Sequence, residues 1–431
     1  MDYTNKLITT EQALALVKSG YKVAVGEGQG APRGFLSKFH TLEDKVNNVE
    51  LWTCRLPQGF PMLEMRNITF CTIHDTFITK PLRNAEFKNI SYVPTHLSKL
   101  GATVSAQRVP DIFVTTCSLP KPNGMVSSGL SGGLAKELRQ KSRIIIAEIN
   151  ENMPYTYGDT EFSLNDVDYV TEENIPLNPV ILGKVSDRDR EIGNLVAEYI
   201  DDGDCLQVGI GGIPDALMQC LKDKKDLGIH TELLGDGLID LVEAGVVTNA
   251  RKTLYKGKIV TSIVDGTQKA FDFVNDNKDV IVFDSSYTND VAVLQQNDNQ
   301  VSVNTTLEVD LTGQCCSESL GSRQYSGTGG QADTAIGAQR AKNGKSFIVL
   351  GSTANVLESG NVKMISKIVP QLKRGATVSL QRNDVQYIAT EYGIVNLRGC
   401  SMKERALKLI SIAHPGFRDW LTEEAEKLNL I

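Results

Sequence analysis

The chain has 431 residues, of which 41% are hydrophobic and 23% are charged, and its formal net charge is −7. This composition excludes a disordered or fibrous protein, and the length predicts two large domains. No apolar run approaches the roughly 18 residues that a membrane-spanning helix requires, and the N-terminus lacks the basic-then-apolar order of a signal peptide. The mild negative charge argues against nucleic acid or an anionic membrane as a partner.

Strands and helices alternate along the chain. Residues 11–19 have helical spacing and end at Gly20, residues 21–25 read as a strand, and residues 26–30 read as a turn. Further strands are expected at 112–115, 144–147, 206–208, 280–283, 347–350 and 387–389, and helices at 188–201, 214–222 and 403–412. Buried strands that alternate with helices predict an α/β fold with mostly parallel sheets.

Two pairs of similar segments recur in the same order in both halves. Residues 20–28 (GYKVAVGEG) resemble 203–211 (GDCLQVGIG), and residues 101–108 (GATVSAQR) resemble 375–382 (GATVSLQR). Chance recurrence of a common strand and turn composition is one interpretation. We favour duplication, which predicts two related α/β domains.

The charged stretch 184–190 marks the expected domain boundary. We therefore assign residues 1–185 to an N-terminal domain and residues 186–431 to a C-terminal domain, with a ligand at their junction. The eight cysteines form no Cys-x-x-Cys pair and the five histidines form no His-Glu-x-x-His sequence. This pattern predicts reduced thiols, a cytoplasmic protein and no metal site.

Glycine-rich turns provide the first candidates for ligand binding. Gly209-Ile-Gly-Gly-Ile-Pro214 follows a strand and opens a helix, a place where backbone N–H groups suit an anion. Pro214 stands where a dinucleotide fingerprint needs its third glycine, so a nicotinamide enzyme is disfavoured. Gly344-Lys345-Ser346 ends like a P-loop, but Gln339 replaces the required glycine. For the turn at 209–214 two interpretations remain: it binds a phosphate or thioester ligand, or it is a tight turn without a ligand.

The densest glycine cluster is Tyr325-Ser-Gly-Thr-Gly-Gly-Gln331. Successive N–H groups in such a segment can point at one oxygen and form an oxyanion hole. A flexible loop is the alternative, and we favour the functional interpretation because Tyr325 and Gln331 are not typical linker residues.

Four glutamates stand at the ends of apolar strands, Glu27, Glu148, Glu232 and Glu391. Glu232 is the preferred candidate, because it ends a predicted strand, precedes a Gly-Asp-Gly turn and lies on the expected ligand side of a parallel sheet. A carboxylate there can act as a base or as a nucleophile. His230 shares its strand face with Glu232, and we interpret it as a structural residue.

These motifs together resemble the acetyl-CoA hydrolase/transferase family within the class I CoA-transferases, and within it the 4-hydroxybutyrate and butyrate:acetate CoA-transferases. The strongest resemblance lies from about residue 190 to the end of the chain. It is carried by residues 207–215, 227–232, 325–331, 365–370, 390–393 and 412–418, with weaker similarity at 147–159.

The resemblance implies that Glu232 is the nucleophile, which attacks an acyl-CoA and passes through a glutamyl-CoA thioester. It implies oxyanion donors at Asn289, Gly329 and Gly330. A carboxylate is already ionised at neutral pH, so this chemistry needs no partner base. The residues implied to bind substrate or CoA are Gln207, Val208, Gly209, Ile210, Gly211, Gly327, Gln331, Lys345 and Lys367.

The resemblance also implies that a coenzyme A thioester and a small carboxylate are the substrates. It implies no permanently bound cofactor and a homodimer or higher homo-oligomer. Glu27 is an unusual charge in its glycine loop, and with Arg33 it would shape a more polar site for the acid; a surface pair is the alternative. An acyl-CoA hydrolase and a non-catalytic CoA-binding protein remain alternative functions.

Overall fold

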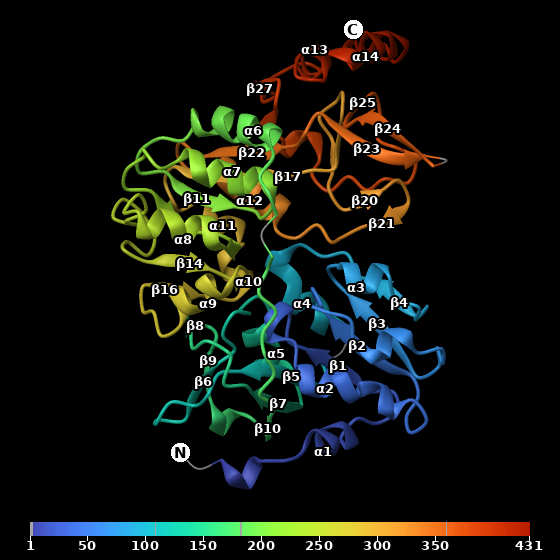
Figure 1. Ribbon diagram of the computed structural model, residues 1–431, viewed down its shortest axis with the longest axis vertical. Coiled ribbons are helices and arrows are strands. Elements are labelled where there is room, and N and C mark those ends of the chain that lie inside the picture. The colour runs from blue at the N-terminus through green and yellow to red at the C-terminus, as the bar shows by residue number, and fades with distance from the viewer. Residues whose placement is uncertain (1–2, 108, 182, 359) are drawn as a thin grey trace. The chain divides into compact units, whose positions relative to one another are not determined.

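The computed structural model describes the chain except residues 1–2, 108, 182 and 359. Its contacts define two compact units (Figure 1), Met1–Ile181 with Val260–Thr288 and Leu182–Ile259 with Asn289–Ile431. The expected division at residue 185 differs from these units in one respect, because residues 260–288 group with the first unit. The physical reason is strand pairing, since β16 (Val280–Val282) pairs in parallel with β8 (Tyr157–Gly158).

The first unit contains a seven-stranded sheet in which neighbouring strands are parallel. Strands β1 and β5 at its centre are buried at every residue, as expected where both faces of a parallel sheet are covered. In spatial order the strands are β10 (Tyr169–Glu172), β7 (Ile144–Ile149), β5 (Ile112–Cys117), β1 (Lys22–Val25), β2 (Val49–Thr53), β3 (Cys71–Asp75) and β4 (Ile90–Tyr92). The α-helices of this unit are α1 (Thr10–Ala15), α2 (Arg33–Lys38), α3 (Lys80–Arg83), α4 (Leu100–Ser105), α5 (Ala135–Lys141), α9 (Gln268–Val274) and α10 (Ser285–Thr288).

The second unit contains a six-stranded sheet, which is parallel except for its last pair, β26 with β27. In spatial order its strands are β12 (Gly228–Ile229), β11 (Cys205–Val208), β17 (Gln300–Thr305), β22 (Lys345–Val349), β26 (Tyr387–Thr390) and β27 (Gly393–Asn396). The α-helices are α6 (Asp187–Ala197), α7 (Gly212–Cys220), α8 (Asp236–Glu243), α11 (Val291–Leu294), α12 (Gln331–Arg340), α13 (Met402–Ser411) and α14 (Pro415–Lys427). The predicted fold class, α/β with mostly parallel sheets, is therefore confirmed.

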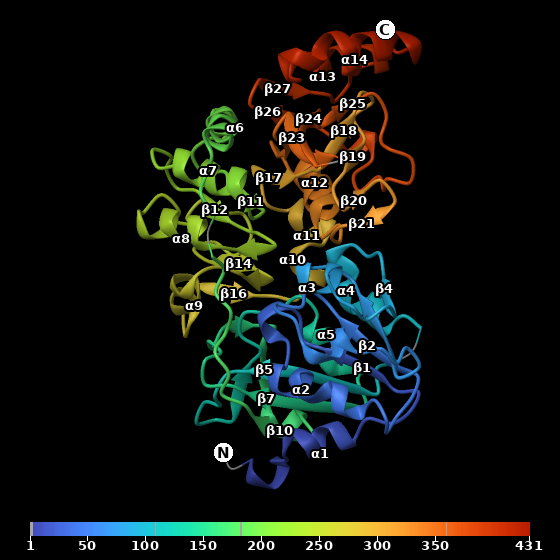
Figure 2. The same ribbon diagram turned by 45° about the vertical axis from the view of Figure 1, so that its right-hand side comes forward.

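Smaller sheets complete the second unit. Strands β23 (Thr353–Glu358) and β24 (Asn361–Ser366) form an antiparallel hairpin, and β18 (Glu308–Asp310) pairs with β19 (Cys315–Cys316) and β25 (Ile368–Val369). Helices α13 and α14 lie beside β27 at the C-terminal end (Figure 2). Their apolar residues Leu409 and Leu421 belong to the same buried cluster as Ile388 of β26.

The two pairs of similar segments have different outcomes. Residues 20–28 contain β1 and residues 203–211 contain β11, and each strand pairs in parallel with a neighbour on both sides. The second pair does not match in structure. Residues 101–105 belong to helix α4, whereas residues 375–381 are turn and irregular chain. The last residue of the earlier copy, Arg108, lies outside the described residues.

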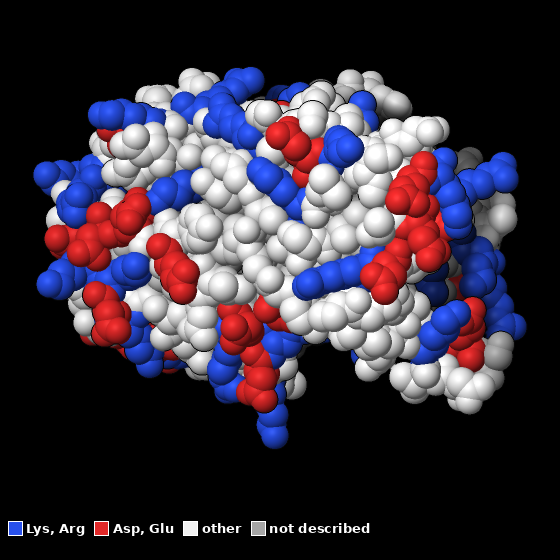
Figure 3. All heavy atoms as spheres, turned by 90° about the horizontal axis from the view of Figure 1, so that it is seen from above, with Lys and Arg blue, Asp and Glu red and all other residues white. Residues whose placement is uncertain are grey.

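The surface carries charges of both signs. On the face shown in Figure 3, lysine and arginine side chains are intermingled with aspartate and glutamate. A search of the described residues found no helix with the length and apolar character that crossing a membrane requires.

Candidate active site

The second unit brings Glu232, Asn289 and Gly330 together. Glu232 lies in a bend between β12 and the short strand β13 (Leu233–Leu234), and its side chain is partly exposed. The Gly-Asp-Gly segment that follows opens helix α8, with Gly235 as its N-cap, and does not form the turn that the sequence suggested. Asn289 follows helix α10, and Gly330 is the N-cap of helix α12.

A hydrogen bond joins the carboxylate to the amide. Asn289 Nδ2 donates to Glu232 Oε2 at 3.1 Å, across 57 residues of sequence. Asn289 is fully buried, and its Oδ1 has no partner among the described residues. Asn289 therefore presents a donor to the carboxylate and a buried acceptor beside it, a costly arrangement unless a ligand or water completes it.

Gly330 lies directly against the same two groups. A Cβ atom added at Gly330 would overlap both Glu232 Oε2 and Asn289 Nδ2. Only a glycine therefore allows the start of α12 to approach the carboxylate this closely. The preceding Gly329 has a φ of +59°, a conformation that also favours glycine. The N-terminus of this ten-residue helix carries a partial positive charge, which stabilises an anion nearby.

Two other residues of the glycine cluster have structural contacts. Gly327 is buried. Gln331 is also buried, and its amide donates to the carbonyl oxygen of Thr305 at 2.7 Å and accepts from the Ser317 hydroxyl at 2.7 Å. These bonds fix the first turn of α12 to the end of β17.

Gln207 and Val208 are the last two residues of strand β11, directly before the glycine turn, and both are buried. Gln207 Oε1 accepts a 2.7 Å hydrogen bond from Ser302 of β17. The Ser302 hydroxyl in turn lies 3.1 Å from that of Thr334 on α12. Through this network Gln207 connects the central strands to the helix that approaches Glu232.

The turn after β11 is open to solvent. Ile210 is 52% exposed, Gly209 is partly exposed and Gly211, the N-cap of α7, has a φ of +120°. As a glycine, the N-cap residue Gly211 has no side chain with which to cap this helix. A Cβ at Gly212 would come within 2.7 Å of Asp189 Oδ2, so a carboxylate already lies beside the α7 N-terminus. This neighbour disfavours a phosphate at that position.

The two predicted lysines lie at opposite ends of their sheet. Lys345 begins β22, and its ammonium lies 2.7 Å from Asp201 and 3.4 Å from Asp204. Lys367 lies at the carboxyl end of β17, where its ammonium donates to the carbonyl oxygen of Thr306 at 3.3 Å. Burial, and secondarily Arg188, lowers the pKa of Lys367 to about 8. The structure therefore places only Lys367, of these two, at the strand ends where Glu232 also lies.

Glu148 and Glu391 have structural partners, and Glu27 is buried. Glu148 accepts the N–H groups of Gly34 and Phe35 at 3.2 and 3.0 Å, and burial raises its pKa to about 7. Glu391 accepts two hydrogen bonds from Ser352. Glu27 is 1% exposed, so it forms no surface pair.

Arg33, the suggested partner of Glu27, is 3% exposed. Its guanidinium donates to Gln29 Oε1 at 2.6 Å and to the carbonyl oxygen of Pro176. Gln29 in turn donates to the carbonyl oxygen of Asn178 at 2.6 Å. The glycine loop of the first unit is therefore joined to residues 176–178 by buried polar contacts.

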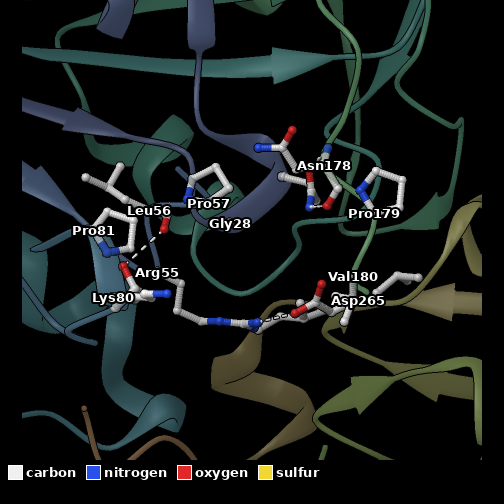
Figure 4. A pocket seen from close by; sticks show the side chains of 14 residues that line it. Gly28, Arg55, Leu56, Pro57, Lys80, Pro81, Asn178, Pro179, Val180 and Asp265 are labelled. Carbon is white, nitrogen blue, oxygen red and sulfur yellow. Dashed lines mark hydrogen bonds and ion pairs between the residues drawn. The ribbon is translucent and has the colours of Figure 1, made fainter. Parts of the chain in front are cut away.

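Gln29 and Asn178 also border a cavity of about 340 Å³ within the first unit. Figure 4 shows Arg55 extending along this cavity to Asp265, and the two charges are 2.5 Å apart. Most of the other lining is apolar, from Leu56 and several prolines and valines. A mostly apolar pocket of this size with a few polar groups suits a small ligand. No local motif predicts this cavity, because its walls come from segments distant along the chain.

Sequence reasoning also missed the buried side chains that hold the backbone next to Glu232. Lys252, Asn297 and Gln300 contact residues 229 and 230. No spacing rule marks such residues. Among the described residues, no three His, Cys, Asp or Glu side chains gather where they could hold a metal ion.

Comparison with protein families gives the class. A model described as the acetyl-CoA hydrolase/transferase N-terminal domain matches residues 1–181, and one described as the C-terminal domain matches residues 266–425. The chain therefore belongs to the acetyl-CoA hydrolase/transferase family, as its motifs predicted.

Curated relatives match over nearly the full length. The chain is 38% identical to the 4-hydroxybutyrate coenzyme A transferase of Clostridium kluyveri, over 99% of this chain and 98% of that protein. It is 37% identical to the succinyl-CoA:cyclohexane-1-carboxylate CoA transferase of Geobacter metallireducens, over 100% and 97%. It is 34% identical to the butyryl-CoA:acetate CoA-transferase of Anaerostipes caccae, over 100% and 98%. These names confirm the predicted enzyme class, the CoA-transferases.

Solved structures agree with this fold. RipA from Yersinia pestis is 34% identical and superposes with a TM-score of 0.93, over 100% of both chains. The 4-hydroxybutyrate CoA-transferase from Porphyromonas gingivalis is 32% identical with a TM-score of 0.81, over 99% of this chain and 98% of that one.

Proposed function

We propose that this protein transfers coenzyme A between an acyl-CoA and a small carboxylic acid, with Glu232 as the nucleophile. One observation carries the proposal: a partly exposed glutamate faces a buried amide donor and the glycine that begins a helix. Donors fixed beside a reacting carboxylate are what acyl transfer through tetrahedral oxyanions requires.

The chemistry follows from the carboxylate. Its oxygen attacks the thioester carbonyl, the C–S bond breaks, and the CoA thiolate leaves a mixed anhydride on Glu232. The thiolate then attacks the glutamyl carbonyl, which gives a glutamyl-CoA thioester and releases the first acid. A second carboxylate attacks this thioester, and the returning thiolate takes the new acyl group and frees Glu232. Each broken thioester is replaced by an activated anhydride and then by a new thioester, so no oxidant or nucleotide is needed.

Asn289 Nδ2 and the backbone of Gly329 and Gly330 are the proposed oxyanion donors. Gln207 to Gly211, Gly327, Gln331 and Lys367 are proposed to line the CoA thioester, and Lys345 is the weakest of the proposed CoA contacts because acidic side chains already hold it. Binding energy from the remote parts of CoA would then position the reacting carbonyl against Glu232.

The acid substrate is proposed to be a short carboxylic acid, such as acetate, butyrate or 4-hydroxybutyrate. The names of the relatives support this class. We also propose a cytoplasmic homodimer or higher homo-oligomer with no permanently bound cofactor. Its two domains are proposed to divide near residue 185, with residues 260–288 returning to the first domain.

Hydrolysis is a second candidate. A relative named acetyl-CoA hydrolase, from Kluyveromyces lactis, is 31% identical over 52% of this chain. Water would then attack the glutamyl-CoA thioester in place of a second carboxylate, which releases free CoA and restores the Glu232 carboxylate. The same intermediate serves both functions, so the fate of the thioester distinguishes them.

The test is the intact mass of the protein after incubation with butyryl-CoA and no acceptor acid. A CoA-sized adduct on the peptide that contains Glu232, absent in Glu232→Gln, supports the transferase. Released CoA with unmodified protein supports hydrolysis. If butyryl-CoA stays intact, and acetyl-CoA with added acetate also stays unchanged, both enzymatic functions are contradicted. A CoA-binding protein is then the remaining function.

A further inference from the structure

The segment that ends at Glu232 is held by side chains that do not face the carboxylate. Residues 229–231 run from strand β12 to the bend at Glu232. Four side chains, each at most 5% exposed, bind this segment: Asn249, Lys252, Asn297 and Gln300. Their contacts leave the backbone before Glu232 few ways to shift.

Ile229 is bound through both its backbone N–H and its carbonyl oxygen. Its N–H donates to Asn249 Oδ1 at 2.8 Å, and its carbonyl oxygen accepts from the Lys252 ammonium at 2.7 Å. The same ammonium donates to the carbonyl oxygen of Lys258 at 2.7 Å. A Cβ at Gly228 would overlap the Lys252 chain, so β12 packs directly on it. Burial lowers the pKa of Lys252 to about 8, and at neutral pH the ammonium is retained.

His230 is fully buried and fixed through its ring and its backbone. Its Nδ1 lies 3.0 Å from Asn297 Nδ2, and Gln300 Nε2 donates to its carbonyl oxygen at 3.3 Å. Asn297 Oδ1 accepts the N–H of Leu254, which orients the Asn297 amide group so that its NH₂ faces the ring. An NH₂ group only donates, so Nδ1 accepts and the ring is the neutral tautomer with its proton on Nε2.

Thr231 completes the support by joining the segment to β11. Its hydroxyl lies 3.4 Å from the N–H of Val208 and donates to the carbonyl oxygen of Leu233 at 3.1 Å. The residues on both sides of Glu232 are therefore tied to buried groups, while the Glu232 side chain reaches toward Asn289 and Gly330.

We propose that His230 and Lys252 are positioning residues for the nucleophile, which hold residues 229–231 so that the Glu232 carboxylate meets Asn289 and the start of α12. This inference rests on the proposed function of Glu232 and adds a role for two residues that do not touch the substrate. Displacing a reacting group by about 1 Å can cost about a hundredfold in rate, so the backbone before Glu232 is sensitive to its supports.

The first test replaces the ring. His230→Leu keeps much of the volume and removes the Nδ1 acceptor, whereas His230→Asn keeps an acceptor near that position. We expect His230→Leu to lower kcat by about ten- to a hundredfold, with KM for acyl-CoA within about threefold of the native value. We expect His230→Asn to recover most of kcat. Active sites are counted through the glutamyl-CoA adduct, so loss of folded protein does not enter kcat.

The second test removes the ammonium. Lys252→Met keeps the length of the chain but leaves the Ile229 carbonyl without its donor, and we expect a similar fall in kcat. Lys256→Met, at an exposed lysine in the same loop, is the matched control. Native kcat per active site in both His230→Leu and Lys252→Met overturns the inference. If Glu232→Gln itself keeps turnover, the proposed function of Glu232 fails. Because this outcome is measured on a different variant, it is distinguishable from a failure of the positioning role.

Discussion

Glu148 in the first unit and Glu232 in the second occupy comparable places, because each carboxylate lies against a glycine at the start of a helix. Glu148 Oε2 would be 2.9 Å from a Cβ at Gly34, in helix α2, and Glu232 Oε2 would overlap one at Gly330, before α12. The surroundings differ. Glu148 is 1% exposed and takes two backbone N–H groups, whereas Glu232 is partly exposed and has a side-chain amide donor.

The difference shows how one local arrangement supports two roles. Burial raises the pKa of Glu148 to about 7, so near neutral pH a substantial fraction of it holds a proton and is a poor nucleophile. The same burial keeps substrate away. Glu232 is accessible, and a side-chain amide donates to its carboxylate. Access, more than the glycine and the helix start, separates the proposed nucleophile from the buried carboxylate.

Removing the Glu232 carboxylate is expected to have the greatest effect on turnover. Glu232→Gln keeps the shape of the side chain but cannot form an anhydride or a thioester. We expect turnover to fall by at least about a thousandfold, because a covalent nucleophile has no substitute in the site. Steady-state exchange between butyryl-CoA and acetate measures the loss. Turnover within tenfold of native would show that another group is the nucleophile.

Adding a methyl group at each glycine compares the two sites directly. In Gly330→Ala the new Cβ overlaps the Glu232 and Asn289 side chains, which must move. We expect kcat to fall by about a hundredfold with a modest change in thermal stability.

The counterpart in the first unit is Gly34→Ala, whose Cβ would press on Glu173 and Glu148. We expect it to lower the melting temperature while kcat per folded enzyme stays within about threefold. If the two alanines lower kcat equally, the proposed contrast between a reactive and a structural carboxylate is wrong.

The pH dependence of stability tests whether the buried Glu148 carboxyl is protonated in the folded protein. The pKa of Glu148 is about 7 in the folded protein, above the ordinary value of 4.5. Between these values the folded state holds a proton that the unfolded state has lost. The resulting stabilisation is full below pH 4.5 and is lost as pH rises through 7, by about 3 kcal/mol.

Glu148→Gln removes this titration while an amide oxygen can still accept from α2. We expect the fall in unfolding free energy between pH 5 and pH 8 to be smaller in the variant than in the native protein. Denaturant unfolding at the two pH values measures it. The quantity to compare is the fall in unfolding free energy of the variant against that of the native protein. Burial also raises the pKa of Asp75 to about 7, and Asp75 contributes equally to the fall in both proteins. Equal falls would show that Glu148 is ionised throughout.

The pattern of apolar residues along the chain predicted several strands correctly, but it did not predict which segments contact one another. The apolar runs at 112–115 and 144–147 became strands β5 and β7, because such runs are buried wherever the sheet forms. The predicted helix 11–19 stops earlier, at Ala15, since Leu16 closes the last turn through Ala13 and Leu14. The identical sequences GATVS at 101–105 and 375–379 adopt a helix and irregular chain, so tertiary surroundings overrode local preference there.

The candidate site was predictable in part, for the same physical reason. Glu232 and the glycine cluster were marked by residue type and by likeness to a family. Their approach through Gly330, and the support from Lys252 and Asn297, depend on packing between segments distant in sequence. Spacing along the chain does not contain that information. It also does not show which strand end Lys367 approaches, because that depends on the contact with Thr306.

The smallest expected effect concerns the pair Lys345 and Lys367. Lys345→Met removes ion pairs with Asp201 and Asp204 at the amino end of β22, far along the strand from its carboxyl end. The Lys345 side chain is 21% exposed, so we expect a stability loss of about 1 kcal/mol and a KM for acyl-CoA within about twofold of native. Lys367→Met removes a cation at the carboxyl end, where we expect KM to rise by about tenfold. A larger rise in KM for Lys345→Met than for Lys367→Met would mean that CoA binds at the amino end of the sheet. The proposed CoA site at the carboxyl end of the second unit's sheet would then be wrong.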